Sequence, residues 1–181
     1  MLYKYDKSSL QYVKTKQYTI IYILCIVILI GSFYIKNKPE ESVESEVLVI
    51  LLEQNKFSEE KLITHIKEMN FRFPYIVYAQ SVLETGNFSS PVFKENNNLF
   101  GMKEAKITVT LSKGTKRKHA YYTNWRESLY DYGMYYSTYL YKITTEENYY
   151  NYLQQYYAEN PEYVSKLKEI IKQKDLINKF K

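Results

Sequence analysis

At 181 residues and with near-average apolar content, the chain can support one domain of modest size plus an accessory segment. Its single cysteine and two distant histidines exclude a disulfide framework and leave too few ligands for a zinc site, so no metal or cofactor is expected. The net charge of +5 would suit a polyanion, but no nucleic-acid-binding motif accompanies it, so no nucleic-acid partner is expected.

Residues 18–35 read YTIIYILCIVILIGSFYI, an uncharged run of eighteen residues. As a helix that rises about 1.5 Å per residue, this run is just long enough to cross a bilayer core of about 30 Å. It ends without the small residues of a signal-peptide cleavage site, so we expect a retained single transmembrane helix in the cytoplasmic membrane. Four lysines precede the run, whereas only Lys36 and Lys38 follow it before the acidic stretch. This asymmetry predicts that residues 1–17 are cytoplasmic and that the chain after residue 36 is extracytoplasmic. A buried core helix is the alternative interpretation.

An acidic stretch follows the apolar run, with five glutamates and no lysine or arginine between Pro39 and Gln54. Its charge and its proline are typical of a tether between folded parts. Residues 47–52 are continuously apolar and are expected to begin the folded region or to pack along its edge. We therefore expect an acidic linker and edge segment over residues 36–55 and a folded domain over residues 56–181.

Two helices are predicted at the start of the folded region. Ser58 is suited to cap a helix, because acidic residues follow it in the first turn and apolar residues recur at helical spacing over residues 62–69. Pro74 is tolerated at the first position of a second helix, which Gly86 is expected to close.

Turn-forming residues and alternation mark the middle of the domain. Residues 89–100 contain serine, proline and three consecutive asparagines, which predict an irregular loop. The alternation in ITVTL and the pair Lys113-Gly114 predict a β-hairpin over residues 107–122. Further helices are predicted after Trp125, after Thr145 and over residues 161–174. This pattern, with twenty-two tyrosines and only five glycines, indicates a mainly α fold with a small β-hairpin lobe (α+β) and an aromatic core.

Glu84 is the residue whose position suggests chemistry. It ends an apolar helix and precedes the asparagine-rich loop, so a rigid element would hold its carboxyl at the edge of a cleft. Apolar surroundings raise the pKa of a carboxyl by penalising its charged form, which suits a proton donor to a glycosidic oxygen. The alternative is an ordinary surface glutamate at a helix C-terminus, and position alone favours that alternative.

Two motifs stand close together in the chain, AQSVLETG at residues 79–86 and NNLFGMK at residues 97–103. Together, at this spacing, they resemble the signature of the glucosaminidase family of glycoside hydrolases, also described as mannosyl-glycoprotein endo-β-N-acetylglucosaminidases. The similarity extends over residues 58–170 and includes YYTNWRES at residues 121–128. It implies a lysozyme-like fold and cleavage of the peptidoglycan backbone after N-acetylglucosamine.

The resemblance also implies roles for particular side chains. The residue that matches the family's general acid is Glu84, and Tyr132 matches a tyrosine that the family places in the cleft beside the acid. Asn97 and Asn98 would order the loop beneath the cleft, and Phe100 would pack it. The residues expected to bind the glycan are Gln80, Asn97, Asn98, Phe100 and Tyr122.

A second carboxylate is harder to assign. Inverting glycosidases hold a base about 6.5–9.5 Å from the acid, and retaining ones hold a nucleophile about 5–5.5 Å away. Residues 105–126, however, contain neither aspartate nor glutamate. The candidates next to this segment are Glu104, Glu127 and Asp131. Alternatively, the 2-acetamido oxygen of the substrate attacks the anomeric carbon while Tyr132 steadies the developing charge, and we favour this route.

Two other functions are open on the sequence. A lytic transglycosylase also uses one glutamate in a lysozyme-like fold, although the NNLFG element favours the hydrolase. A wall-binding protein without turnover would explain why the lobe lacks a carboxylate, whereas the intact motif around Glu84 favours catalysis.

Overall fold

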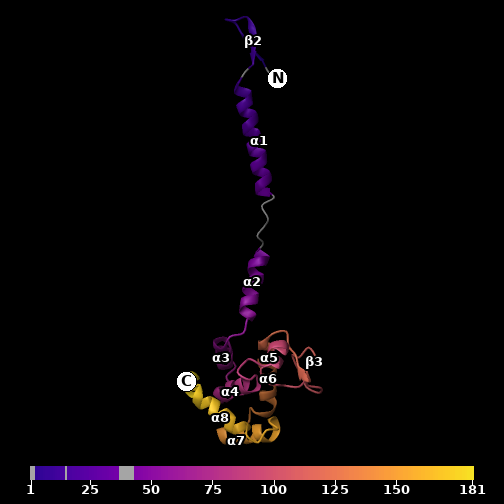
Figure 1. Ribbon diagram of the computed structural model, residues 1–181, viewed down its shortest axis with the longest axis vertical. Coiled ribbons are helices and arrows are strands. Elements are labelled where there is room, and N and C mark those ends of the chain that lie inside the picture. The colour runs from indigo at the N-terminus through magenta and orange to yellow at the C-terminus, as the bar shows by residue number, and fades with distance from the viewer. Residues whose placement is uncertain (1–2, 15, 37–42) are drawn as a thin grey trace. The chain divides into compact units, whose positions relative to one another are not determined.

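The structure is a computed structural model that describes residues 3–14, 16–36 and 43–181 (Figure 1). The chain divides into two compact units, Met1–Glu53 and Gln54–Lys181. Both motifs that resemble the glucosaminidase signature lie in the second unit, which therefore holds the candidate site.

The first unit begins with a small hairpin in which β1 (Tyr3–Asp6) pairs antiparallel with β2 (Gln11–Lys14). The next element, α1 (Lys16–Lys36), includes residues 18–35, for which the sequence predicts a membrane span. Within the described parts of the chain, no helix combines the length and the apolar character that a membrane crossing requires.

The helix α2 (Val43–Asn55) occupies much of the segment that the sequence assigns to an acidic linker. The start of that segment, residues 37–42, lies outside the described residues. The side chains of residues 47–52 are exposed. A continuous apolar run suits a helix as well as a strand, because it lacks the alternation that distinguishes the two.

The second unit begins with two helices that the sequence predicts. Ser58 caps α3 (Glu59–Glu68) by accepting a hydrogen bond from a backbone N–H of the first turn at 3.2 Å. The next helix, α4 (Pro74–Glu84), starts with proline and ends before Gly86, which has a positive φ of 54°. Residues 76–82 of α4 are all buried, so this helix runs through the interior and fixes the position of its C-terminal end.

The asparagine-rich segment is partly helical, so the prediction of an irregular loop over residues 89–100 is wrong for α5 (Pro91–Asn96). Ser90 caps this helix by accepting a hydrogen bond from the N–H of Phe93 at 3.1 Å, and proline occupies the first helical position. Both features are signals of a helix start, and they outweigh the turn-forming residues around them. Asn97 then ends the helix in the left-handed region, with a φ of 53°.

The second hairpin is shorter than the sequence predicts, and it turns at a different place. Its strands are β3 (Thr115–Lys116) and β4 (His119–Ala120), which pair antiparallel. The two residues between them, Arg117 and Lys118, both have positive φ, as the tightest hairpin turns require. The predicted turn at Lys113-Gly114 is therefore wrong.

The predicted strand ITVTL is also absent, since residues 107–111 form no strand. The side chains of Ile107 and Val109 are 98% and 80% exposed, so the alternation does not reflect one buried face. The N–H of Leu111 donates to Asp131 Oδ1 at 3.0 Å instead of to a neighbouring strand. A side-chain anchor thus takes the place of the expected backbone pairing.

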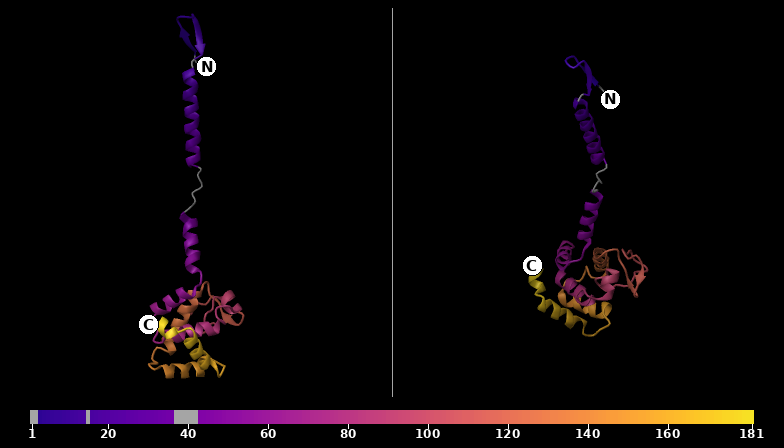
Figure 2. Two further views of the ribbon diagram at one scale, coloured as in Figure 1. Left: turned by 60° about the vertical axis from the view of Figure 1, so that its left-hand side comes forward. Right: turned by 45° about the horizontal axis from the view of Figure 1, so that its top comes forward.

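Helical structure resumes at the predicted places. The elements are α6 (Trp125–Tyr139), α7 (Glu146–Tyr152), the π-helical turn η1 (Leu153–Tyr157), α8 (Tyr163–Gln173) and α9 (Leu176–Lys179). Within this unit, the β3–β4 hairpin lies on the side away from the C-terminus in every view (Figure 1 and Figure 2). A mainly α fold with a small β-hairpin lobe is thus confirmed.

The core of the second unit forms around α4, which packs against α3, α8 and α9. Leu62 and Ile66 of α3, Val77 of α4 and Leu167 of α8 are fully buried at these contacts. The first residue of α8 is Tyr163, and packing of α8 against α4 brings this tyrosine close to the end of α4.

We expect Leu167→Ala to destabilise the protein by about 2–5 kcal/mol, the range for removing a fully buried leucine side chain. The free energy of unfolding of the full-length chain, from chemical denaturation, measures the effect. Lys172→Ala is the matched control, since this exposed residue lies on the same helix and should change stability by no more than about 0.5 kcal/mol. Equal losses in the two variants would contradict the packing described above.

Candidate active site

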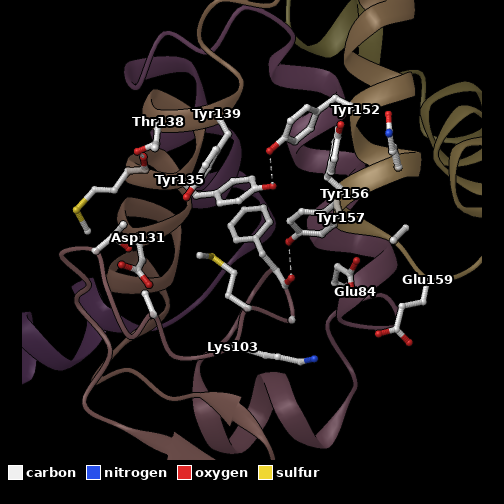
Figure 3. A pocket seen from close by; sticks show the side chains of 18 of the residues that line it. Glu84, Lys103, Asp131, Tyr135, Thr138, Tyr139, Tyr152, Tyr156, Tyr157 and Glu159 are labelled. Atoms are coloured by element: carbon white, nitrogen blue, oxygen red, sulfur yellow. Dashed lines mark hydrogen bonds between the residues drawn. The ribbon is translucent and has the colours of Figure 1, made fainter.

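Glu84 is the last residue of α4 and lines a cleft of about 860 Å³ (Figure 3). The hydroxyl of Tyr163 donates a hydrogen bond to Glu84 Oε1 at 2.8 Å. The other carboxyl oxygen faces Gly101, where a Cβ atom would lie 2.9 Å from Glu84 Oε2. Gly101 also has a φ of 64°. Glycine therefore satisfies both the backbone conformation and the close approach of the carboxyl.

Burial raises the pKa of Glu84 above its ordinary value, because it penalises the charged carboxylate. The hydrogen bond from Tyr163 and the charge of His119 lower this pKa, but they do not cancel the effect of burial. A carboxyl with a raised pKa keeps its proton at a higher pH than a surface glutamate does, and can donate it to a leaving group. This environment differs from that of an ordinary surface glutamate.

The loop that contains Gly101 is held by two asparagines. The side-chain nitrogen of buried Asn98 donates to two backbone carbonyls at 2.9 Å, and its oxygen accepts from two backbone N–H groups at 3.2 Å. These partners are the backbones of Phe100, Met102 and Ala120. Asn97 donates to the carbonyl of Tyr122 at 3.0 Å. Both side chains therefore fix the loop against the hairpin, and direct contact of either with a glycan stays a prediction.

Tyr132 lies beneath the cleft. Its side chain is fully buried, and its ring stacks on that of Phe100 with centroids 4.1 Å apart. Its hydroxyl donates to Gln80 Oε1 at 2.6 Å, and Gln80 Nε2 donates to the Tyr163 hydroxyl at 3.4 Å. Hydrogen bonds thus link Tyr132 and Gln80 to Glu84 through Tyr163. Both side chains are buried, and their contact with a substrate stays a prediction.

Asp131 also lines the cleft, on the side away from Glu84 (Figure 3). It accepts three hydrogen bonds, from the hydroxyls of Thr110 and Tyr122 at 2.9 Å and 2.8 Å and from the N–H of Leu111 at 3.0 Å. Tyr122 is buried, and its hydroxyl donates to Asp131. Contact of Tyr122 with a glycan stays a prediction. This carboxylate anchors the β lobe to α6.

The other two candidate carboxylates make local interactions. Glu127 accepts a hydrogen bond from the N–H of Thr123 at 2.8 Å, just before the start of α6, and it pairs with Lys113 at 3.6 Å. Glu104 accepts a hydrogen bond from the hydroxyl of Thr115 at 2.5 Å within the lobe. Neither carboxylate lines the cleft. Of the three candidates, only Asp131 therefore shares the cleft with Glu84.

Three residues near Glu84 are not singled out by the sequence, namely Tyr157, Glu159 and Tyr163. Tyr157 lines the cleft and donates to the carbonyl of Phe100 at 2.6 Å, and burial raises the pKa of its phenol. Glu159 is exposed on the same side of the cleft as Glu84 (Figure 3). Tyr157 and Glu159 stand just before Pro161 and Tyr163 just after it. This tyrosine-rich stretch is an unspecific signal in a chain with twenty-two tyrosines.

A helical domain that holds one carboxyl of raised pKa in an aromatic-lined cleft is an arrangement that glycoside hydrolases use. The family model described as glucosaminidase, mannosyl-glycoprotein endo-beta-N-acetylglucosaminidase, matches residues 60–176, and the chain belongs to this family. No curated protein matches the chain. Among solved structures, it resembles the catalytic domain of the autolysin Auto from Listeria monocytogenes. The TM-score is 0.45 and the identity 22%, over 78% of this chain and 99% of that one.

We expect Tyr163→Phe to raise the pKa of Glu84 further, because it removes a hydrogen bond that favours the carboxylate. A ¹³C NMR titration of the side-chain carboxyl measures this pKa directly. Since the folded-state pKa of Glu84 already lies above its ordinary value, the stability associated with this group is present at low pH and lost as pH rises through that pKa. In Tyr163→Phe, this loss should extend to a higher pH.

Tyr141→Phe is the control for this titration, because Tyr141 is an exposed tyrosine that does not line the cleft. It should leave the pKa of Glu84 unchanged. A pKa that stays constant or falls in Tyr163→Phe would show that the phenol does not stabilise the carboxylate.

Proposed function

We propose that the protein is a peptidoglycan hydrolase, an endo-β-N-acetylglucosaminidase that cuts the glycan backbone after N-acetylglucosamine with Glu84 as the general acid. The observation that carries the proposal is the half-buried carboxyl of raised pKa at the end of a rigid helix, in a cleft. Membership of the glucosaminidase family supports the class of reaction. The substrate and the point of cleavage follow from the resemblance of the two motifs.

In the reaction we propose, Glu84 donates its proton to the oxygen that joins two sugars, and the bond from this oxygen to the anomeric carbon breaks. The 2-acetamido oxygen of N-acetylglucosamine forms a bond to the anomeric carbon as the second sugar leaves. Water then attacks the anomeric carbon, and the bond from this carbon to the acetamido oxygen breaks. The water gives a proton to the Glu84 carboxylate, which restores the acid. The product is a strand with N-acetylglucosamine at its reducing end.

This substrate-assisted route requires no second carboxylate. That suits a cleft in which Asp131 already accepts three hydrogen bonds. Tyr157 would face the developing charge in place of Tyr132, because Tyr157 lines the cleft and Tyr132 is buried in the core. The alternative is a two-carboxylate route in which exposed Glu159 activates the water.

The decisive substitution is Glu84→Gln, which keeps the shape of the side chain but removes the transferable proton. We expect the rate of cleavage of purified sacculi to fall by at least about two orders of magnitude, the usual scale for general-acid catalysis. The thermal unfolding transition should remain, since the amide can still accept a hydrogen bond from Tyr163. Glu147→Gln, at an exposed position in the first turn of α7, is the control and should leave the rate unchanged.

Equal rates for Glu84→Gln and the unmodified chain would contradict the assignment of the acid. Mass spectrometry of the fragments separates the remaining functions. A reducing N-acetylglucosamine end supports the hydrolase, whereas an anhydromuramic end identifies a lytic transglycosylase. Binding of sacculi without any release of fragments would identify a wall-binding protein.

We also propose that residues 18–35 anchor the chain in the cytoplasmic membrane with the second unit on the extracytoplasmic side. The proposal rests on the sequence, namely eighteen uncharged residues with four lysines in the segment before them and two between them and the acidic stretch. The full-length chain should sediment with membranes and be released by detergent but not by high salt. Release by salt alone would contradict insertion, because salt screens charges but does not solubilise an apolar segment.

A further inference from the structure

Four tyrosines form one side of the cleft that contains Glu84, and we call them the tyrosine wall. Tyr135 and Tyr139 come from α6, Tyr152 from α7 and Tyr156 from η1. Figure 3 shows them along one side of the pocket, with Lys103 on the opposite side. The reaction proposed above does not use them.

The rings of the tyrosine wall are connected to one another. The ring centroids of Tyr135 and Tyr139 lie 5.0 Å apart, and those of Tyr152 and Tyr156 also lie 5.0 Å apart. The hydroxyl of Tyr135 donates to that of Tyr152 at 3.3 Å, which joins the two pairs. The wall is therefore one aromatic surface built from two segments of the chain.

Neighbouring tyrosines at the π-helical turn η1 serve two purposes. The N–H of Ala158 donates to the carbonyl of Leu153 at 3.0 Å, so the turn is one residue wider than in an α-helix. Tyr157 then points inward and binds the carbonyl of Phe100, while Tyr156 stays on the cleft wall. Such turns are often found at functional sites.

Exposure alone does not distinguish these tyrosines. Tyr139 and Tyr156 are 50% and 65% exposed, but Tyr130 and Tyr141, which do not line this cleft, are 41% and 62% exposed. The difference lies in the arrangement, because the wall residues are paired and lie in the same cleft as Glu84. Tyr130 and Tyr141, which lie outside this cleft, are therefore suitable controls for the tyrosine wall.

We propose that the tyrosine wall binds sugar rings of the glycan away from the bond that is cut, so that the protein acts on extended strands in preference to short fragments. The inference rests on the proposed function. A pyranose ring has an apolar C–H face and a rim of hydroxyls, and tyrosine offers an apolar face and a hydroxyl in the same way. Tyrosine also loses little side-chain entropy when a ligand orders it.

The size of the cleft supports more than one bound sugar. At about 860 Å³, it lies near the upper end of the range of about 300–1,000 Å³ for pockets that bury a whole small ligand. Binding energy gained from sugars that do not react can be used to orient the bond over the acid. An extended strand would thus be cut faster than a fragment that does not reach the wall.

The test measures binding separately from catalysis. The full-length chain carrying Glu84→Gln is titrated with a linear hexamer of β-1,4-linked N-acetylglucosamine, and Kd is obtained by calorimetry. Adding Tyr139→Ala and Tyr156→Ala should raise Kd by on the order of tenfold, as truncating aromatic anchors typically does. Adding Tyr139→Phe and Tyr156→Phe instead should preserve most of the affinity, because the stacking faces remain.

Tyr130→Ala with Tyr141→Ala, in the same Glu84→Gln chain, is the matched control and should leave Kd unchanged. The inference is overturned if the hexamer does not bind, if the wall variant binds as tightly as its parent, or if the control loses as much affinity. The proposed function fails on a different result, namely undiminished wall cleavage by Glu84→Gln. The two failures are therefore distinguishable.

Discussion

The carboxyl of Glu84 lies between the hydroxyl of Tyr163 and the backbone of Gly101, half withdrawn from water. Holding an ionisable group there costs stability whenever it is charged, at about 1.4 kcal/mol for each unit by which its pKa is raised. The surrounding structure supports this arrangement. Buried α4 fixes the backbone of the acid, and the bonds of Asn98 hold Gly101 in a conformation that leaves room for the carboxyl.

Tyrosine serves here as both core residue and polar connector. Tyr132 is fully buried, yet its hydroxyl is satisfied by Gln80 and lies 3.2 Å from that of Tyr149. An aromatic ring contributes apolar area to the core, while the hydroxyl transmits a fixed geometry through Gln80 to Tyr163. Phenylalanine in place of Tyr132 and Tyr163 would fill nearly the same volume but leave the amide of Gln80 without the two hydroxyls that it contacts.

The β lobe is tied to α6 by the side chain of Asp131. Its hairpin has two residues in each strand, and Asp131 supplies three further hydrogen bonds to the lobe and the segment after it. The candidate second carboxylate that shares the cleft with Glu84 is thereby engaged in holding the lobe in place. This arrangement is compatible with the reaction that we propose, in which the substrate provides its own nucleophile.

The sequence by itself determined most helices of the second unit, although not α5, and it singled out the candidate acid. Ser58, Pro74 and Gly86 act on the backbone within a few residues, and the two linked motifs single out Glu84. Tertiary structure alone decided the position of the hairpin turn, the burial of Tyr132 and the residues that surround the carboxyl. These features depend on contacts between distant parts of the chain, as between Tyr163 and Glu84, which are 79 residues apart. Local patterns carry no information about such contacts, because the free energy that selects them comes from packing the whole domain.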